Sequence, residues 1–323
     1  MKAETLISIV THNDAATLRL CLESLARLET PARVKVWDNA SADGSAGIAQ
    51  GLEVPVTACP DNLGYCGGHN RNIQGEEFDF VLFMNADVIL APDFLARLLP
   101  VFEHSPETGM AVGKLLRMDE LGCPVLENGF PVLDSTGIVF HRNQRHLDRG
   151  SGEPDTGRYD RREAVFGGTG AALLCSRRLV EDLKIRGEFW DEDFFAFRED
   201  ADLAWRARLL GWQAVYEPSA RALHRRHVRP ENRGELPSLI NMHSVKNRFL
   251  MRRKNMDRDL WKHCFPSLVF RDLGIICYIL LKERTSLEAF RLLWRMRGRT
   301  KAKRREIQAR RKVSGGEISP WFL

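Results

Sequence analysis

A chain of 323 residues with 44% hydrophobic and 28% charged residues has the composition of a soluble globular protein and can bury a sizeable core. Its seven cysteines are odd in number and form no CxxC pair, which argues against a disulfide framework and a zinc knuckle. The sequence holds no run of 18 uncharged apolar residues, and it turns polar at Thr11 before a signal-peptide core forms. We therefore expect a cytoplasmic protein that is not exported.

The net charge of +5 is unevenly distributed along the chain. Residues 245–312 hold 21 Lys and Arg against 6 Asp and Glu, a net charge of +15, which leaves −10 for the rest. Such a basic segment is typical of contact with a polyanion, either a nucleic acid or an anionic lipid surface. The simpler alternative is a solvated basic helix that covers part of the acidic body.

The first 115 residues alternate short apolar runs with helix-like segments, as expected for a mostly parallel sheet wound with helices. A helix capped by Asn13 or Asp14 follows the first strand, Ser41 opens a second helix, and Pro92 begins another. A glycine-rich turn over 62–68 leads into a further helix. The predicted strands are 6–11, 34–38, 54–58 and 80–84.

The second half of the chain is less regular. Residues 122–164 show no clear period and are interpreted as loops and short strands. After this region an apolar run ends at Cys175, Ser176 caps a helix, and residues 199–210 form a helix that ends at Gly211. A short strand is predicted over 214–216.

Two apolar stretches lie near the C-terminus. Residues 267–281 are apolar but interrupted by Arg271 and Asp272, and a hydrophobic stripe runs from Leu287 to Trp294 beside many arginines. A helix of this kind can lie in a membrane interface, although it cannot span a membrane. The alternatives are an ordinary helix packed on the body and a surface that forms a homo-oligomer.

Each predicted strand of the first half delivers polar or acidic residues to one edge of the sheet. In an open parallel sheet, ligands bind beyond the carboxyl ends of the strands. Four such ends in succession favour a polar ligand over a purely structural sheet. These ends are Thr11 to Asn13, Asp38 to Asn39, Pro60 to Asn62, and Asn85 to Asp87.

The types of residue at these ends suit a nucleotide. Asp38 can accept hydrogen bonds from a base or a ribose, and Gly64, Gly67 and Gly68 would let the backbone approach a ribose or a phosphate. Glycines at such positions are nevertheless more often turn formers. The segment matches neither the GxGxxG pattern nor a P-loop, which argues against a dehydrogenase and a P-loop enzyme.

Asp87 follows an apolar strand, where a carboxylate at the rim of the sheet can bind a hard divalent cation that bridges two phosphates. Taken alone, such an aspartate is usually a turn or helix cap. His224 and His227 follow the strand predicted at 214–216, and either could ligate a metal.

An aromatic run over 194–197 leads into Glu199, Asp200 and Asp202. Mutual repulsion and the exclusion of water should raise the pKa of one of these carboxyl groups, which suits it to take a proton from an alcohol. The alternative is an acidic first turn that the helix dipole stabilises.

Together, six ordered motifs resemble glycosyltransferase family 2, whose members invert the anomeric centre and have the GT-A fold. Each motif alone is weak, but six in the right order make a chance match improbable. The resemblance covers roughly residues 5–250. The motifs are Ser8 to Asn13, Val36 to Ser45, Asn62 to Asn70, Phe83 to Val88, Gly168 to Ala171, and Glu199 to Trp205 with Gly211 and Trp212.

The resemblance implies a nucleotide site and a metal site. Asp87 would bind Mg²⁺ or Mn²⁺, and His224 resembles a histidine that completes metal coordination in some members, although His227 leaves the register open. The family motif is often Asp-x-Asp, whereas Asn85 stands at its first position here, as is common in bacterial rhamnosyltransferases. The residues implied to contact the nucleotide are Thr11, Asn13, Asp38, Asn62, Gly67, Gly68 and Asn85.

The resemblance also implies a mechanism, with Asp200 as the catalytic base and Glu199 as its neighbour and less favoured substitute. The expected donor is a nucleotide sugar, with dTDP-rhamnose as the first guess. The expected acceptor is a glycan or lipid-linked intermediate in cell-surface polysaccharide synthesis. The chain would then divide into a GT-A domain over 1–250 and a basic, partly amphipathic helical region over 251–323, peripheral to the inner face of the plasma membrane.

Three other functions are weighed against this one. Another transferase or nucleotidyl enzyme could use the same nucleotide site, because a fold does not fix a function. A nucleic-acid-binding protein is disfavoured because Trp294 is the only aromatic residue near the arginines of 295–312, and because the body is acidic. An inactive scaffold is disfavoured because Asp87 and Asp200 are both present.

Overall fold

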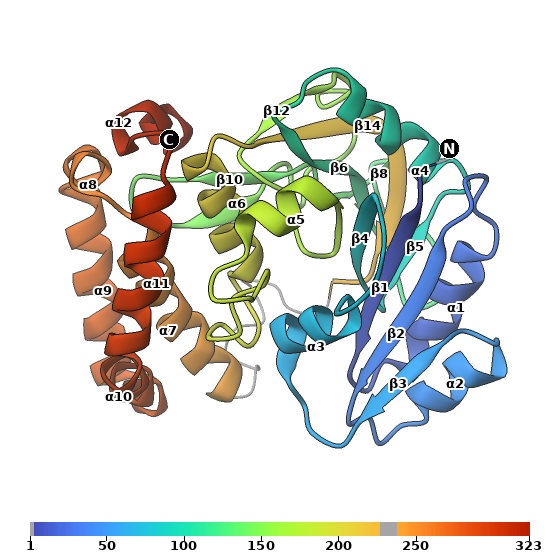
Figure 1. Ribbon diagram of the computed structural model, residues 1–323, viewed down its shortest axis with the longest axis horizontal. Coiled ribbons are helices and arrows are strands. Elements are labelled where there is room, and N and C mark those ends of the chain that lie inside the picture. Colours follow the sequence, from blue (N-terminus) through green and yellow to red (C-terminus); the bar gives the residue numbers. More distant parts are fainter. Residues whose placement is uncertain (1–2, 227–237) are drawn as a thin grey trace.

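The computed structural model describes residues 3–226 and 238–323. A central twisted sheet lies between layers of helices, and further helices from the C-terminal part of the chain stand together at one end of the molecule (Figure 1). The main sheet has the order β12-β14-β6-β13-β4-β1-β2-β3, with β5 added beside β14 and β9 beside β6. This arrangement confirms the predicted α/β class.

The N-terminal half of the sheet is parallel, as predicted. Its strands are β1 (Thr5–Thr11), β2 (Arg33–Asn39), β3 (Val56–Cys59) and β4 (Phe80–Asn85), paired in the order β3-β2-β1-β4. The helices between and after them are α1 (Ala15–Leu25), α2 (Ser45–Gly51), α3 (Gly64–Asn72) and α4 (Phe94–Leu98), followed by the short 3-10 helix η1 (Leu99–Glu103).

The other half of the sheet is mixed. β13 runs antiparallel to both of its neighbours, β4 and β6, because the chain returns to this position without a crossover helix, whereas β6 and β14 are parallel. Its strands are β5 (Val88–Leu90), β6 (Thr108–Arg117), β9 (Leu133–Ser135), β12 (Glu163–Val165), β13 (Ala172–Ser176) and β14 (Gln213–His224).

Strand β6 was not among the predicted elements, although it lies inside the sheet. Its apolar run is interrupted by Lys114, whose side chain is fully buried and bonds to Asp155 and Asp160 at 2.9 and 2.5 Å. Residues 122–164 form loops and short strands, as predicted. These strands are β7 (Leu126–Glu127), β8 (Phe130–Pro131), β10 (Ile138–Phe140) and β11 (His146–Asp148).

The two faces of the sheet bury two separate apolar clusters. Along β4, Val81 and Phe83 point into one cluster while Leu82 and Met84 point into the other, as the two-residue period of a strand requires. Helices α1 and α4 cover the second cluster. Helices α3, α5 and α6 and the C-terminal helices share the first cluster. The C-terminal helices are therefore packed onto the side of the sheet that α3, α5 and α6 cover.

The glycine-rich turn predicted over 62–68 is wrong from Gly64 onward, where helix α3 begins. A side chain at Gly68 would collide with Val10 and Trp37 of the sheet, and one at Gly64, whose φ is +70°, would collide with Phe195. These glycines therefore allow α3 to pack closely against its neighbours, which is a reason for glycine inside a helix that periodicity does not show.

Helices dominate the rest of the chain. Helix α7 spans residue 250 and packs against α6, α10 and α11, and the division of the chain at that residue stays a prediction. The remaining elements are α5 (Arg177–Leu183), α6 (Glu199–Leu209), α7 (Ser238–Asn255), α8 (Arg258–Cys264), α9 (Ser267–Leu281), η3 (Arg284–Leu287), α10 (Glu288–Arg295), α11 (Arg297–Arg310), α12 (Gly315–Ile318) and η4 (Ser319–Trp321).

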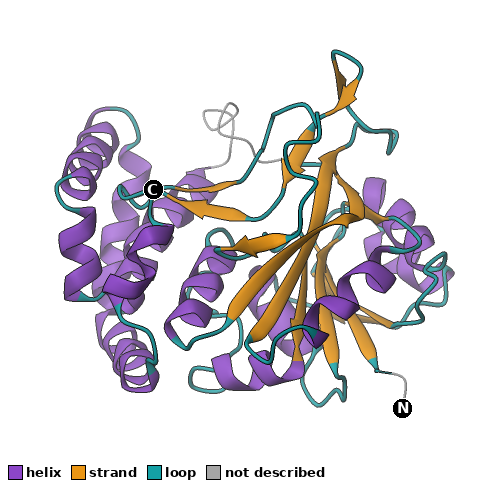
Figure 2. Ribbon diagram, turned by 90° about the horizontal axis from the view of Figure 1, so that it is seen from above, coloured by secondary structure: helices purple, strands orange, loops and turns teal. Residues whose placement is uncertain are grey.

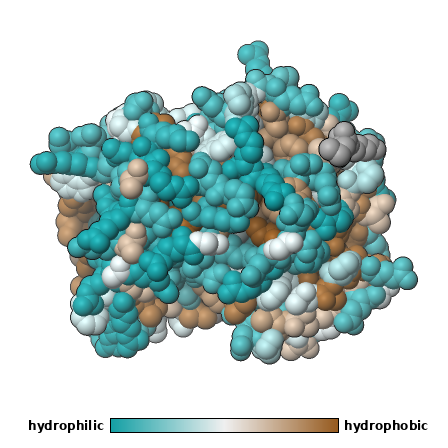
Figure 3. Space-filling model, viewed as in Figure 1, coloured by the Kyte–Doolittle hydropathy of each residue, from teal (hydrophilic) through white to brown (hydrophobic). Residues whose placement is uncertain are grey.

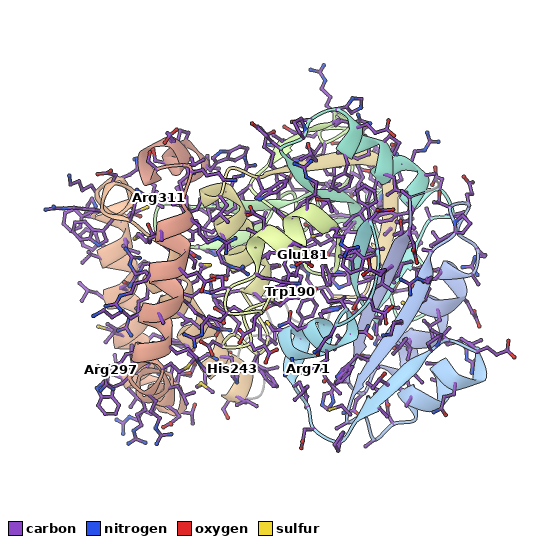
Figure 4. All side chains as sticks on the ribbon, in the orientation of Figure 1. Arg71, Glu181, Trp190, His243, Arg297 and Arg311 are labelled. Carbon is purple, nitrogen blue, oxygen red and sulfur yellow. The ribbon has the colours of Figure 1, made fainter. Side chains whose placement is uncertain are left out.

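Helix α11 covers acidic side chains of the body. Lys303 is buried and lies 2.6 Å from Asp191 and 2.8 Å from Glu188, while Arg310 bonds to Asp182. Figure 4 labels Arg297 and Arg311 near the two ends of this helix, with the body on its right. Part of the positive charge of α11 is thus paired with the acidic body, as the simpler alternative expects.

Among the described residues, no single helix is long and apolar enough to cross a membrane. Helices α8 and α9 pass that test of length and composition only as a pair, and they are bent by 76° at their junction.

Candidate active site

The strand register brings the predicted polar residues to one edge of the sheet. Thr11 stands opposite Asp38 across the β1–β2 pair, and Val10 stands opposite Asn85 across the β1–β4 pair. Asp38 is 3% exposed, and its Oδ2 accepts a hydrogen bond from the Ser41 backbone at 3.2 Å. Its Oδ1 accepts no hydrogen bond from any described residue, so this buried oxygen is available to a donor on a ligand.

Thr11 and Asn13 tie the loops after β1 and β2 together. The Thr11 hydroxyl donates to Asp14 Oδ2 at 3.0 Å, and Asn13 Oδ1 accepts from the Ala42 backbone at 2.8 Å. Asn13 has a φ of +61°, a conformation that asparagine tolerates better than most residues. The structure therefore supports a loop-shaping role for both residues, and their contact with a nucleotide stays a prediction.

Asn62 lies at the start of α3, where its Oδ1 accepts a hydrogen bond from the Gly64 backbone at 2.8 Å. Gly67 and Gly68 lie within that helix, and their packing against Leu63 and the sheet explains them without a ligand. The predicted contacts of these three residues with ribose and diphosphate are therefore untested.

Asp87 and His224 meet because of a strand pairing. In the antiparallel β5–β14 pair, His224 stands opposite Val88, the residue that follows Asp87. The His224 Nε2 lies 3.3 Å from Asp87 Oδ1, and the His224 Nδ1 lies 2.7 Å from Asp134 Oδ2. The imidazole is thus held between two buried carboxylates.

The electrostatics of this group favour a cation. Burial alone would lower the pKa of His224, but the negative charges of Asp87 and Asp134 outweigh it and raise the pKa to about 10. At pH 7 this imidazole is therefore protonated, with one carboxylate facing each ring nitrogen. A cation that displaced the Nε2 proton would meet a histidine whose Nδ1–H donates to Asp134, which is the usual arrangement of a histidine that ligates a metal. Two protein ligands suffice for a cation that also binds a diphosphate and water.

Within the described part of the chain, no cluster of three or more His, Cys, Asp or Glu side chains is arranged to hold a metal by itself. His227, the predicted alternative to His224, lies outside the described residues.

Asp200 is in the first turn of α6, and its two carboxylate oxygens are fixed by backbone donors. Oδ1 accepts from the Ala201 backbone at 2.7 Å and Oδ2 from the Gly170 backbone at 3.3 Å. Burial and the charge of Asp148 raise the pKa of Asp200 to about 6. The predicted raised pKa is therefore present, and at neutral pH most of this group is ionised.

Glu199 differs from its neighbour. Burial and the charge of Asp200 raise the pKa of Glu199 to about 8, so this carboxyl group is mainly protonated at pH 7. Its Oε2 is buried and has no hydrogen-bond partner among the described residues. Of the two, Asp200 is the one in the correct protonation state to act as a base.

A series of charged side chains lies between Asp200 and His224. Arg226 Nε lies 2.8 Å from Asp134 Oδ1, and its Nη2 lies 2.5 Å from Asp148 Oδ2. The positive charge of Arg226 opposes the rise in the pKa of Asp200, whereas Asp148 promotes it. Asp87, His224 and Asp200 thus belong to one electrostatic unit.

Sequence reasoning missed Asp134, Asp148 and Arg226. The two aspartates come from β9 and β11, inside the region 122–164 where no periodicity marks an element. Arg226 follows β14 by two residues, and only its nearness to His224 in the sequence could have indicated it.

Comparison with known proteins shows the family to which the chain belongs. The family model described as "Glycosyltransferase like family 2" matches residues 2–249. A curated relative, the N-acetylglucosaminyl-diphospho-decaprenol L-rhamnosyltransferase of Mycobacterium tuberculosis, is 29% identical over 246 residues, which are 67% of this chain and 74% of the relative.

Solved structures show the same fold at lower identity. The mannosyltransferase of Pyrobaculum calidifontis in complex with GDP-Man and Mn²⁺ has a TM-score of 0.55 at 15% identity, over 99% of this chain and 88% of that one. Residues 1–349 of TarS from S. aureus, in complex with UDP-GlcNAc, have a TM-score of 0.56 at 14% identity, over 98% and 90%. The predicted GT-A fold is therefore confirmed, and the chain belongs to glycosyltransferase family 2.

Proposed function

We propose that this glycosyltransferase moves one sugar from a nucleotide-sugar donor to a hydroxyl group of a glycan or lipid-linked acceptor, with inversion at the anomeric carbon. The observation that carries the proposal is the connected unit of Asp87, His224 and Asp200 at the carboxyl edge of the sheet. A cation site and a base in one unit are what a single displacement requires.

The donor would lie across the edge formed by β1, β2 and β4. Asp38 offers a buried carboxylate oxygen with no partner among the described residues, which suits the imide or amino donor of a nucleobase. Thr11, Asn13 and Asn85 would line the same site, and Asn62, Gly67 and Gly68 would flank the ribose and diphosphate.

Mg²⁺ or Mn²⁺ would be held by Asp87 and His224 together with the donor diphosphate. When bound, the cation would neutralise the charge that develops on the departing nucleoside diphosphate. Two solved structures of similar fold, one of them the mannosyltransferase of Pyrobaculum calidifontis, contain Mn²⁺, which supports a divalent cation without deciding between the two metals.

Asp200 would take the proton of the acceptor hydroxyl as that oxygen forms a bond to the anomeric carbon. The bond from that carbon to the diphosphate oxygen would break on the opposite face, and the electron pair would leave with the nucleoside diphosphate. Attack and departure on opposite faces invert the centre. A pKa near the working pH makes a carboxylate efficient in this role.

The donor proposed first is dTDP-rhamnose. Its support is the sequence from Asn85 to Asp87 together with the relative from Mycobacterium tuberculosis, which is an N-acetylglucosaminyl-diphospho-decaprenol L-rhamnosyltransferase. A lipid-linked acceptor of that kind would place the reaction at the inner face of the plasma membrane.

Thermal melting of the protein with a panel of nucleoside diphosphates and nucleotide sugars, with and without Mg²⁺ or Mn²⁺, tests this proposal. A ligand that binds only the folded state raises the Tm by mass action, and a shift of several degrees is expected for the correct donor with metal. Asp87→Ala should remove the metal-dependent part of the shift. No shift with any nucleotide at concentrations above 1 mM, on the order of a weak enzyme KM, would contradict the proposal.

A further inference from the structure

Helix α9 differs from the other C-terminal helices because its outward face is apolar. Only Leu268 and Ile279 of this helix are fully buried, whereas Phe270 is 74% and Leu281 is 76% exposed. Leu273 is also exposed on this face. In the space-filling view, hydrophobic residues gather at the left edge of the molecule, where α9 lies (Figure 3). A contiguous exposed apolar patch on a protein surface usually marks a site of interaction.

A groove of about 700 Å³ runs beside this helix. One wall consists of apolar and aromatic side chains of α9, among them Phe270, Ile275 and Tyr278. The opposite wall is formed by β11, the residue before α6, and α7. Figure 2 shows the hairpin that contains β11 reaching from the sheet toward the C-terminal helices.

Four arginines line the groove, namely Arg145, Arg198, Arg248 and Arg271. Arg248 is neutralised, because it bonds to Asp272 at 3.1 Å. The exposed guanidinium groups of Arg145 and Arg271 make no hydrogen bond or ion pair within the described part of the chain. The groove therefore combines an apolar wall with surplus positive charge.

One residue of the groove lining, Arg198, lies two positions before Asp200 in the chain. Arg198 donates to the His146 imidazole at 2.9 Å and immediately precedes Glu199 and Asp200. Burial and the surrounding arginines lower the pKa of His146 well below its usual range, so this histidine stays neutral and accepts that hydrogen bond. On the same strand, Asp148 stands two residues from His146, a distance of about 7 Å, and its charge acts on Asp200.

We propose that this groove binds a lipid-linked diphosphate acceptor, with the diphosphate on Arg145 and Arg271 and the lipid chain along the apolar face of α9. Arginine recognises phosphate oxygens through paired hydrogen bonds, and an apolar helix beside it provides the complementary surface for a hydrocarbon chain. A sugar attached to that diphosphate would extend toward Asp200. The assignment rests on the proposed function and names its acceptor site.

The experiment measures the affinity of the full chain for geranylgeranyl diphosphate in mild detergent by calorimetry. The Arg145→Ala/Arg271→Ala variant should bind this probe at least tenfold more weakly. Both side chains are exposed, so the variant should fold normally. The Arg253→Ala/Arg305→Ala variant removes two exposed arginines elsewhere on the C-terminal helices and should stay within twofold of the wild type. Equal affinity in the Arg145/Arg271 variant and the wild type would overturn the assignment.

Further probes separate the possible sources of phosphate. Inorganic pyrophosphate and geranylgeraniol should each bind much more weakly than the lipid diphosphate, and Phe270→Ser/Leu273→Ser should weaken only the lipid diphosphate. Pyrophosphate that binds as tightly as the lipid diphosphate would overturn the role of the apolar face. Equal sedimentation with phosphatidylglycerol vesicles that hold or lack the lipid diphosphate would identify a general anionic-lipid surface and overturn the acceptor assignment.

The failure of this inference is distinguishable from failure of the proposed function. The nucleotide-induced rise in Tm depends on the donor site and should be the same in the wild type and the Arg145/Arg271 variant. A normal donor response without lipid-diphosphate binding would overturn the acceptor site alone.

Discussion

Two adjacent carboxyl groups in α6 are given different protonation states by their surroundings. Asp200 has two backbone donors and a pKa of about 6, whereas Glu199 has a buried oxygen with no described partner and a pKa of about 8. Hydrogen bonds to a carboxylate stabilise its charged form, which explains the order of the two values. Pairs of titratable groups whose pKa values are set apart in this way commonly mark the acid and base of an active site.

At the residue scale, Asp200→Asn should lower kcat by about 10²–10⁴-fold, because the amide cannot accept the acceptor proton. Donor binding should be nearly intact, because Asp200 is proposed to contact the acceptor hydroxyl and not the nucleotide or its phosphates. Steady-state kinetics and the nucleotide-induced shift in Tm measure the two effects separately. Glu199→Gln serves as the control and should cost much less activity. Near-normal turnover in Asp200→Asn would show that another group is the base.

The pH dependence of kcat/KM provides a second prediction. Because the base must be ionised, activity should fall about tenfold per pH unit below a pKa of about 6. The charge of Asp148 raises the pKa of Asp200, and Arg226 opposes that rise. Asp148→Asn removes the first effect and releases Arg226 to strengthen the second, so the acidic limb of the profile should move to lower pH. An unchanged acidic limb in this variant would argue against Asp200 as the titrating group.

At the scale of elements, two strands that periodicity does not reveal bring together the residues around His224. β5 pairs with β14 and so places His224 beside Asp87, while β9 supplies Asp134 to the other side of the imidazole. A carboxylate that accepts a hydrogen bond from Nδ1–H orients a ligating histidine and increases its basicity.

Asp134→Asn should therefore raise the Mn²⁺ concentration needed for half-maximal activity by about 10–100-fold, with little loss of activity at saturating Mn²⁺. Titration of activity with Mn²⁺ measures the effect, and a melting curve checks that the variant is folded. Asp259→Asn, an exposed substitution on α8, is the matched control. If Asp134→Asn required no more Mn²⁺ than this control, the orientation of His224 by Asp134 would not matter for the metal.

At the scale of the whole molecule, the acidic body and the basic C-terminal helices are complementary. Lys303 of α11 forms ion pairs with Glu188 and with the buried carboxylates of Asp191 and Asp193. Lys254 of α7 also forms an ion pair with Asp191. Some of the positive charges of the C-terminal helices thus hold these helices against residues 188–193 through ion pairs. The exposed apolar face of α9 lies outside this network.

Lys303→Met should destabilise the whole protein by about 3–5 kcal/mol, because it leaves buried carboxylates without a partner. Arg305→Met changes an exposed residue on the same helix and should alter stability by less than about 0.5 kcal/mol. Chemical unfolding of both variants, followed by circular dichroism, gives the comparison. Similar unfolding midpoints for the two variants would show that the buried ion network contributes little.

The sequence by itself determined the fold class, the parallel half of the sheet and the family, because those depend on local patterns: apolar strands, caps, and polar residues at strand ends such as Asp38 and Asp87. It also predicted Asp200, within its acidic turn, as a carboxylate with a raised pKa. Only the tertiary structure decided that Gly64 to Gly68 lie in a helix, that β6 is a central strand despite Lys114, and that α11 is paired with the body. It also supplied Asp134 and Arg226, because partners brought together by strand pairing and ion pairs over long sequence separations leave no local period to read.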